Sequence, residues 1–319
     1  MNRVLTALLC LLSVTTATAQ LYPAGWIRIT DDRNSDRTPA WSPDQSSVAF
    51  VRDKDGGSGM HVVVIDPDGS NRRMFTDGTD FVFYPTWFPD GQRLVVDVLD
   101  KGLYTLDITT GDWELLFVPV GHSFSSPSLS PDGQRISYAA IPPEHGSSEL
   151  YLSDLDGGNV VRLTDHEHQD NRPSWSPDGS ALAFERQSYQ GVSTGVYAVN
   201  IDGTGLRLVS PDSMFAAQPS WSPDGSQIAF SGGRRLHDLW LVNVDGTGLR
   251  RLTTNWGATA SDHATPSTPT WSPDGRFIVF TGYGHGNVDL FSIDVVSAVS
   301  AVTPETWGLI KIKTRTHIR

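Results

Sequence analysis

The chain has 319 residues, a formal net charge of -12 at pH 7, 38% hydrophobic residues and a single cysteine. Because nucleic acids and anionic lipid surfaces are themselves negative, this acidity argues against both as partners. A chain of this length can bury a large core, and a closed repeat array can hold it as one domain.

The first segment has the pattern of a secretory signal peptide. Arg3 precedes an apolar run from Val4 to Val14, and small residues follow up to Ala19. The run is too short to cross a bilayer, which needs about 20 apolar residues. We therefore expect cleavage near Ala19, a periplasmic or secreted mature protein and no membrane span. Cleavage removes Cys10, so packing rather than disulfide bonds must stabilise the mature chain.

Six copies of one short phrase dominate the rest of the chain. They read TPAWSPDQSSVAF, YPTWFPDGQRLVV, SPSLSPDGQRISY, RPSWSPDGSALAF, QPSWSPDGSQIAF and TPTWSPDGRFIVF. We call the residue before the turn of each copy its anchor; the anchors are Trp41, Trp87, Leu129, Trp175, Trp221 and Trp271. Their spacings of 46, 42, 46, 46 and 50 residues are typical of a repeat architecture.

One copy shows how a repeat is expected to fold. In the fifth copy Pro219 suits the start of a strand, and Ser222-Pro223-Asp224-Gly225 has the residues of a tight turn. Two apolar strands follow, and Asp245-Gly246 is a hairpin signal before a last short strand. The pattern predicts four antiparallel strands per repeat and no helix. The fold class is therefore all-β, a six-bladed β-propeller of four-stranded antiparallel blades.

The ring also has to close. Trp26-Ile27-Arg28-Ile29-Thr30 looks like the fourth strand of a repeat that lacks its other members, so we expect it to complete the sixth blade as an N-terminal velcro strand. Deletion of residues 20–31 should then lower the melting temperature sharply. The expected organisation is a signal peptide at 1–19, the propeller at 20–306, and a tail at 307–319 whose place the pattern does not give.

The phrase P-x-W-S-P-D-G, with an apolar triplet, D-G and L-T further on, resembles the TolB-type propeller repeat, a relative of WD-type repeats. All six copies keep its Pro-Asp pair, from Pro43-Asp44 to Pro273-Asp274. The resemblance implies a periplasmic propeller that docks other proteins or peptides in the cell envelope. TolB itself carries an additional N-terminal α/β domain, for which this chain has no room, so membership of the Tol system does not follow.

Residues that differ between the copies at a shared position are the candidates for function. Seven residues before the anchors, where each inner strand should begin at one mouth of the channel, stand Asn34, Asp80, His122, His168, Met214 and Ala264, with His263 beside the last. We take Asn34, Asp80, His122, His168, Met214 and His263 as ligand-binding residues. Asp80, His122, His168 and His263 also form a ligand set that could hold a divalent metal.

Two functions remain open from these residues. The first is a binding module, without a cofactor and expected to be monomeric, that docks a protein or peptide at the channel mouth and rim. The second is a metal-dependent carbohydrate-active enzyme, a lyase or hydrolase, centred on the histidines. No G-x-S-x-G motif occurs in the sequence, which argues against a serine peptidase.

Overall fold

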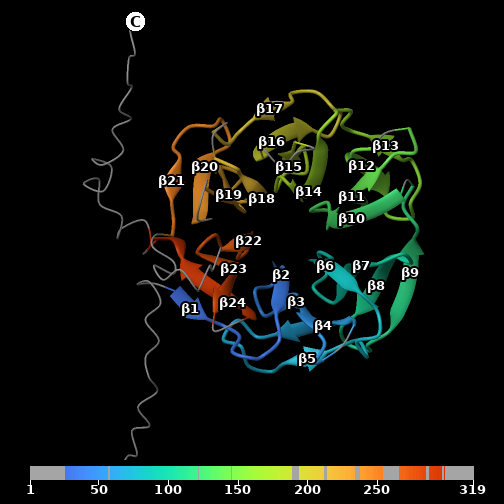
Figure 1. Cartoon of the computed structure of the whole chain (residues 1–319), viewed down its shortest axis with the longest axis vertical. Helices are drawn as coiled ribbons and strands as arrows, with labels where there is room; N and C mark the ends of the chain where they lie inside the picture. The colour runs from blue at the N-terminus through green and yellow to red at the C-terminus, as the bar shows by residue number, and fades with distance from the viewer. Residues whose placement is uncertain are drawn as a thin grey trace, which may run out of the picture.

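In the computed structural model the chain forms six four-stranded antiparallel sheets arranged in a ring (Figure 1). The structure describes residues 26–56, 58–120, 122–144, 146–188, 194–211, 214–233, 238–253, 266–284, 287–296 and 298. The expected signal peptide, its expected cleavage site, the tail at 307–319 and His263 lie outside these residues. The all-β, six-bladed propeller fold is confirmed.

Each of the first three blades takes four consecutive strands. Blade 1 contains β2 (Asp36–Trp41), β3 (Val48–Asp53), β4 (Met60–Ile65) and β5 (Arg73–Met74). Blade 2 contains β6 (Val82–Trp87), β7 (Arg93–Val98), β8 (Gly102–Asp107) and β9 (Trp113–Phe117). Blade 3 contains β10 (His122–Leu129), β11 (Arg135–Ile141), β12 (Glu149–Asp154) and β13 (Val161–Arg162).

Blades 4 and 5 repeat this order, and blade 6 departs from it. Blade 4 contains β14 (Gln169–Trp175), β15 (Ala181–Gln187), β16 (Thr194–Asn200) and β17 (Arg207–Leu208). Blade 5 contains β18 (Ala217–Trp221), β19 (Gln227–Gly232), β20 (Asp238–Asn243) and β21 (Arg250–Arg251). Blade 6 contains β22 (Ser267–Trp271), β23 (Phe277–Gly284) and β24 (Asn287–Asp294), and its outer strand is β1 (Trp26–Arg28).

The N-terminal strand fits blade 6 through the contacts that the other blades use. Ile27 pairs with Ser292, and the hydroxyl of Thr30 accepts the backbone N–H of Leu290 at 2.9 Å. In blades 3 and 5 the threonine of the L-T pair, Thr164 or Thr253, accepts the corresponding N–H at the same distance. Ile29-Thr30 is therefore the L-T pair of blade 6.

The Pro-Asp turns are built from a repeated hydrogen-bond set. In blade 5 the hydroxyl of Ser222 donates to Oδ1 of Asp224 at 2.6 Å, and the same carboxylate accepts the N–H of Ser226. These donors lower the pKa of Asp224. Glycine at the next position has a positive φ in five blades, as Gly225 does at 72°. In blade 1 the residue there is Gln45, and it takes the same conformation, with a φ of 64°.

The anchors pack between blades. Four of the five anchor tryptophans are buried, and Trp41 packs against a core cluster as well. The indole N–H of Trp87 donates to the carbonyl of Ala40, one residue before the anchor of the preceding blade, at 3.0 Å. Trp175 does the same with Ser128 at 2.9 Å. The repeated phrase thus holds each blade to its neighbour and fixes the inner strands around a common axis.

Candidate functional site

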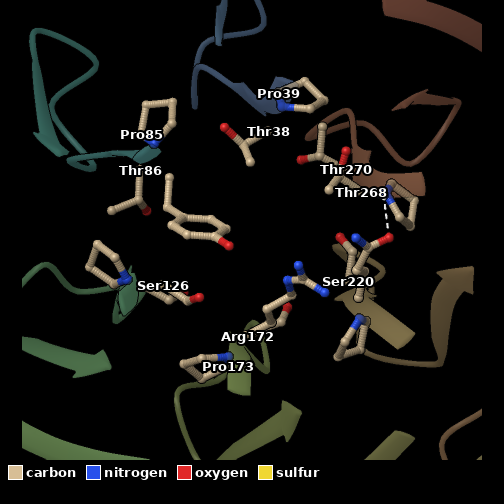
Figure 2. A pocket seen from close by; sticks show the side chains of 17 residues that line it. Thr38, Pro39, Pro85, Thr86, Ser126, Arg172, Pro173, Ser220, Thr268 and Thr270 are labelled. Atoms are coloured by element: carbon tan, nitrogen blue, oxygen red, sulfur yellow. Dashed lines mark hydrogen bonds between the residues drawn. The ribbon is translucent and has the colours of Figure 1, made fainter. Parts of the chain in front are cut away.

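A cavity of about 190 Å³ lies on the axis of the ring, where the inner strands of all six blades meet (Figure 2). Every blade contributes a short stretch around the proline that precedes its anchor. We call the residue three before each anchor the waist residue; these are Thr38, Tyr84, Ser126, Arg172, Gln218 and Thr268. Apart from the prolines, the lining consists of hydroxyl and amide side chains and one arginine.

A backbone irregularity brings the waist residues to the axis. All six have a positive φ, between 48° and 57°, although none is glycine and each precedes a proline. At the same place the pairing of the inner strand with its neighbour shifts register in every blade, as between Arg37 and Ala40 in blade 1. Such bulges re-aim a side chain, and each left-handed residue costs of order 1–3 kcal/mol. Strain repeated six times around one axis marks this ring as the candidate site.

The waist separates two cavities. Five of its six residues, all except Ser126, also line a second cavity of about 400 Å³. That cavity extends toward the beginning of the inner strands, because its lining includes Arg37, Phe83 and Ser267, which precede waist residues. The smaller cavity extends the other way, toward the anchors.

Side chains of the second strands hold three waist residues in place. Arg172 donates to the Glu185 carboxylate at 2.9 Å, and that carboxylate also accepts the N–H of Gln218 at 3.2 Å. The Gln218 side-chain oxygen accepts the Ser231 hydroxyl at 2.9 Å and the N–H of Thr268 at 2.8 Å. Blades 4, 5 and 6 are thus linked at the waist by one polar network.

Arg172 is the positively charged residue of this network, and its surroundings favour the protonated form. Burial opposes the charge, but the Glu185 carboxylate and the Tyr84 hydroxyl outweigh burial and raise the pKa of the guanidinium. The Arg172 side chain keeps 35% of its surface exposed, whereas Glu185 keeps 7%. The guanidinium therefore faces the cavity, and its counter-ion lies behind it.

Four of the residues predicted as ligand-binding because they stand seven positions before the anchors contact other groups and lie outside the two axial cavities. The Asp80 carboxylate is held by the ammonium of Lys101 at 2.8 and 2.9 Å. The His168 ring stacks on His166 with centroids 4.8 Å apart. Met214 packs against a core cluster, and the carbonyl of Asn34 accepts the amide of Asn287. None of the four lines either axial cavity.

The metal site stays a prediction. The backbone of His122 begins β10, but its side chain is outside the described residues, as is His263. Within the described part of the chain, no three His, Cys, Asp or Glu side chains gather in a way that could hold a metal ion. The same part contains no helix of the length and apolarity that a membrane crossing requires.

Sequence reasoning missed the waist. Its signal was present, since every copy has one variable residue directly before the conserved proline. The residue before a proline normally favours an extended conformation, however, and only the bulge turns it to the axis. The geometry defines a class of protein: a six-bladed β-propeller with a polar, strained constriction in its channel.

Comparison with known proteins identifies the family. Residues 57–235 match the family model described as the TolB beta propeller domain, which is more than half of the chain. The chain therefore belongs to this family, and the TolB-type resemblance of its repeats is confirmed.

Individual relatives are more distant. The chain is 32% identical over 107 residues to the Tol-Pal system protein TolB of Francisella tularensis, a match that covers 32% of this chain and 24% of that protein. The crystal structure of TolB from Acinetobacter baumannii superposes with a TM-score of 0.62 at 21% identity, over 78% of this chain and 63% of that one. An oligogalacturonate lyase in complex with manganese superposes at 0.57 with 17% identity, over 88% and 94%. At these identities the structures share the fold alone, and the chain spans only about a quarter of the curated TolB sequence.

Proposed function

We propose that this protein is an exported binding module that docks a protein or peptide segment in its axial channel. The observation that carries the proposal is the ring of six left-handed waist residues, which brings polar side chains to one axis from six blades. Strained residues of this kind cluster at functional sites. A rigid scaffold with a variable polar constriction is suited to recognition.

Two of the four predicted metal-binding residues already have side-chain partners in the described part of the chain. The Asp80 carboxylate is engaged by Lys101 on both oxygens, and the His168 ring by His166. Neither side chain is presented to a substrate in the axial cavities. The proposed partner is a protein or peptide of the cell envelope, consistent with the expected signal peptide and with relatives named for the Tol-Pal system. We propose that the protein acts as a monomer in the periplasm or outside the cell.

A channel-blocking variant tests the proposal. Ser126→Tyr adds a phenol at a waist position, and blade 2 already carries tyrosine in the same backbone conformation at Tyr84. Peptides selected on the wild-type protein from a displayed random library should lose binding to Ser126→Tyr. They should keep binding to Leu206→Tyr, in which the added ring lies on an exposed turn far from the channel lining. Selected peptides that bind both variants equally would contradict channel docking.

The alternative, a metal-dependent carbohydrate-active enzyme at Asp80, His122, His168 and His263, has its own test. Metal analysis of the purified protein is compared with that of the His122→Ala/His168→Ala double variant. A stoichiometric metal that disappears in the variant would favour the enzyme. A protein without metal, whose stability the two substitutions leave unchanged, would exclude it.

A further inference from the structure

The smaller axial cavity has a single charged group in its lining. Of the 17 residues that line it, Arg172 alone is charged, and the others are prolines, hydroxyl residues and one glutamine. The arginine is conspicuous in a chain of net charge -12. A lone cation in a narrow, otherwise neutral polar cavity selects ligands by the sign of their charge.

Arg172 is also oriented before any ligand arrives. An arginine has five N–H donors in a planar fork, and Arg172 donates one of them to Glu185 and also interacts with the Tyr84 hydroxyl, which leaves further donors for a ligand. Because the Glu185 side chain is buried and its carboxylate also accepts the N–H of Gln218, this counter-ion is fixed and keeps the Arg172 guanidinium in place. Figure 2 shows the guanidinium of Arg172 projecting into the open centre of the cavity.

A second group of the waist has unused hydrogen-bonding capacity. Oγ1 of Thr38 is buried and has no hydrogen-bond partner among the described residues. Thr38 lies in blade 1 and Arg172 in blade 4, and both line the same cavity. The Thr38 hydroxyl is closed to solvent and points away from Arg172 in Figure 2, so Arg172 carries the recognition of an acceptor group with two oxygens.

We propose that Arg172 binds the C-terminal carboxylate of the docked peptide; this inference rests on the proposed function. A chain end fits a space of about 190 Å³ that is constricted at the waist, whereas a continuous chain would have to pass through the constriction. Arginine forks bind carboxylates through paired charge-assisted hydrogen bonds, the strongest kind in proteins. Glu185 lies behind the guanidinium and weakens the attraction without blocking the site.

The experiment uses one channel-binding peptide, selected as above, in two forms: with a free C-terminus and as its C-terminal amide. Binding is measured by calorimetry at low ionic strength. We expect the amide to bind at least about 10-fold more weakly, in line with the loss of a charged hydrogen-bonded pair. In Arg172→Gln the two forms should bind equally, while Arg276→Gln, an exposed arginine paired with Asp294, should preserve the difference.

Further variants keep the test decisive if Arg172→Gln does not fold. The Arg172→Gln/Glu185→Gln double variant leaves no unpaired buried charge and should also lose discrimination between acid and amide. Glu185→Gln alone should strengthen binding of the free acid and leave binding of the amide unchanged. If acid and amide bind the wild type equally while Ser126→Tyr blocks both, channel docking stands and the carboxylate assignment falls.

The source of the carboxylate is checked with a sugar acid. Galacturonate presents the same group without a peptide backbone. Weaker binding of galacturonate than of the free-acid peptide supports the peptide assignment. Galacturonate that binds as tightly as the peptide and competes with it, again only when Arg172 is present, would overturn the assignment of a peptide terminus.

Discussion

At the scale of single residues, blade 2 breaks a pattern that three other blades follow. Ten residues after the anchor, on the second strand, Glu185, Ser231 and Thr281 each hydrogen-bond to the waist residue of their own blade. The corresponding residue of blade 2 is Asp97, which is 3% exposed and has one carboxylate oxygen without a hydrogen-bond partner in the described part of the chain. Burial raises the pKa of Asp97 to about 7.

This carboxyl should make stability depend on pH in an unusual direction. The folded protein keeps the Asp97 proton up to about pH 7, whereas the unfolded chain releases it near its ordinary value of 3.8. Between these values the folded state binds more protons, so this group's contribution to stability is lost as the pH rises. Asp97→Asn should therefore be more stable than wild type by an amount that grows from pH 4 to pH 7, up to roughly 2–4 kcal/mol.

Urea unfolding at pH 5, 6, 7 and 8 measures this difference. The control is Asp107→Asn in the same blade, where hydrogen bonds from Thr109 and Thr110 lower the pKa of an exposed carboxylate. Because Asp107 is ionised in both states throughout that range, its difference from wild type should not change with pH. A flat difference for Asp97→Asn as well would show that Asp97 is solvated or paired.

At the scale of elements, the blades could be predicted from sequence, and the channel lining could not. Anchors, Pro-Asp turns and apolar triplets act locally, so their spacing predicts four strands and the number of blades. The lining depends on a bulge of the inner strand at Thr38, Tyr84 and their equivalents. These residue types disfavour a positive φ, and nothing in their identity signals one. The positions seven before the anchors precede this bulge, and their role in ligand binding stays a prediction.

The anchors give a matched test of how much one blade-to-blade hydrogen bond contributes. Trp175 donates its indole N–H to Ser128 at 2.9 Å, whereas the buried indole N–H of Trp221 has no partner among the described residues. Both side chains are buried to a similar degree, at 7% and 9% exposure. Trp175→Phe should cost about 1 kcal/mol more than Trp221→Phe, because it also leaves a carbonyl unpaired. Chemical denaturation compares the two, and equal losses would mean that the bond contributes nothing beyond packing.

At the scale of the whole molecule, the pairing of β1 with β24 joins two segments that lie more than 250 residues apart in sequence. The six blades form one ring in which each blade packs on two neighbours, and blade 6 takes its outer strand from the other end of the propeller. Opening this pairing would expose the edge of β24 and leave Ile29 without the core cluster that it shares with Val48 and Leu290. The ring should therefore unfold as one unit, limited by its weakest junction.

A disulfide across that junction tests this argument. Ile27 and Ser292 are direct partners in an antiparallel pair, where Cα atoms lie about 4.5–5.5 Å apart, within the range that a disulfide spans. Ile27→Cys/Ser292→Cys, with Cys10→Ser, closes a loop of about 265 residues, for which chain entropy gives about 5.6 kcal/mol. The same bridge at Thr105 and Glu114, paired within blade 2, closes a loop of about nine residues and should give about 3 kcal/mol.

Calorimetric melting with and without reductant measures both gains, and the larger gain at the β1–β24 junction should disappear on reduction. Equal gains for the two bridges would show that the junction does not limit unfolding of the ring.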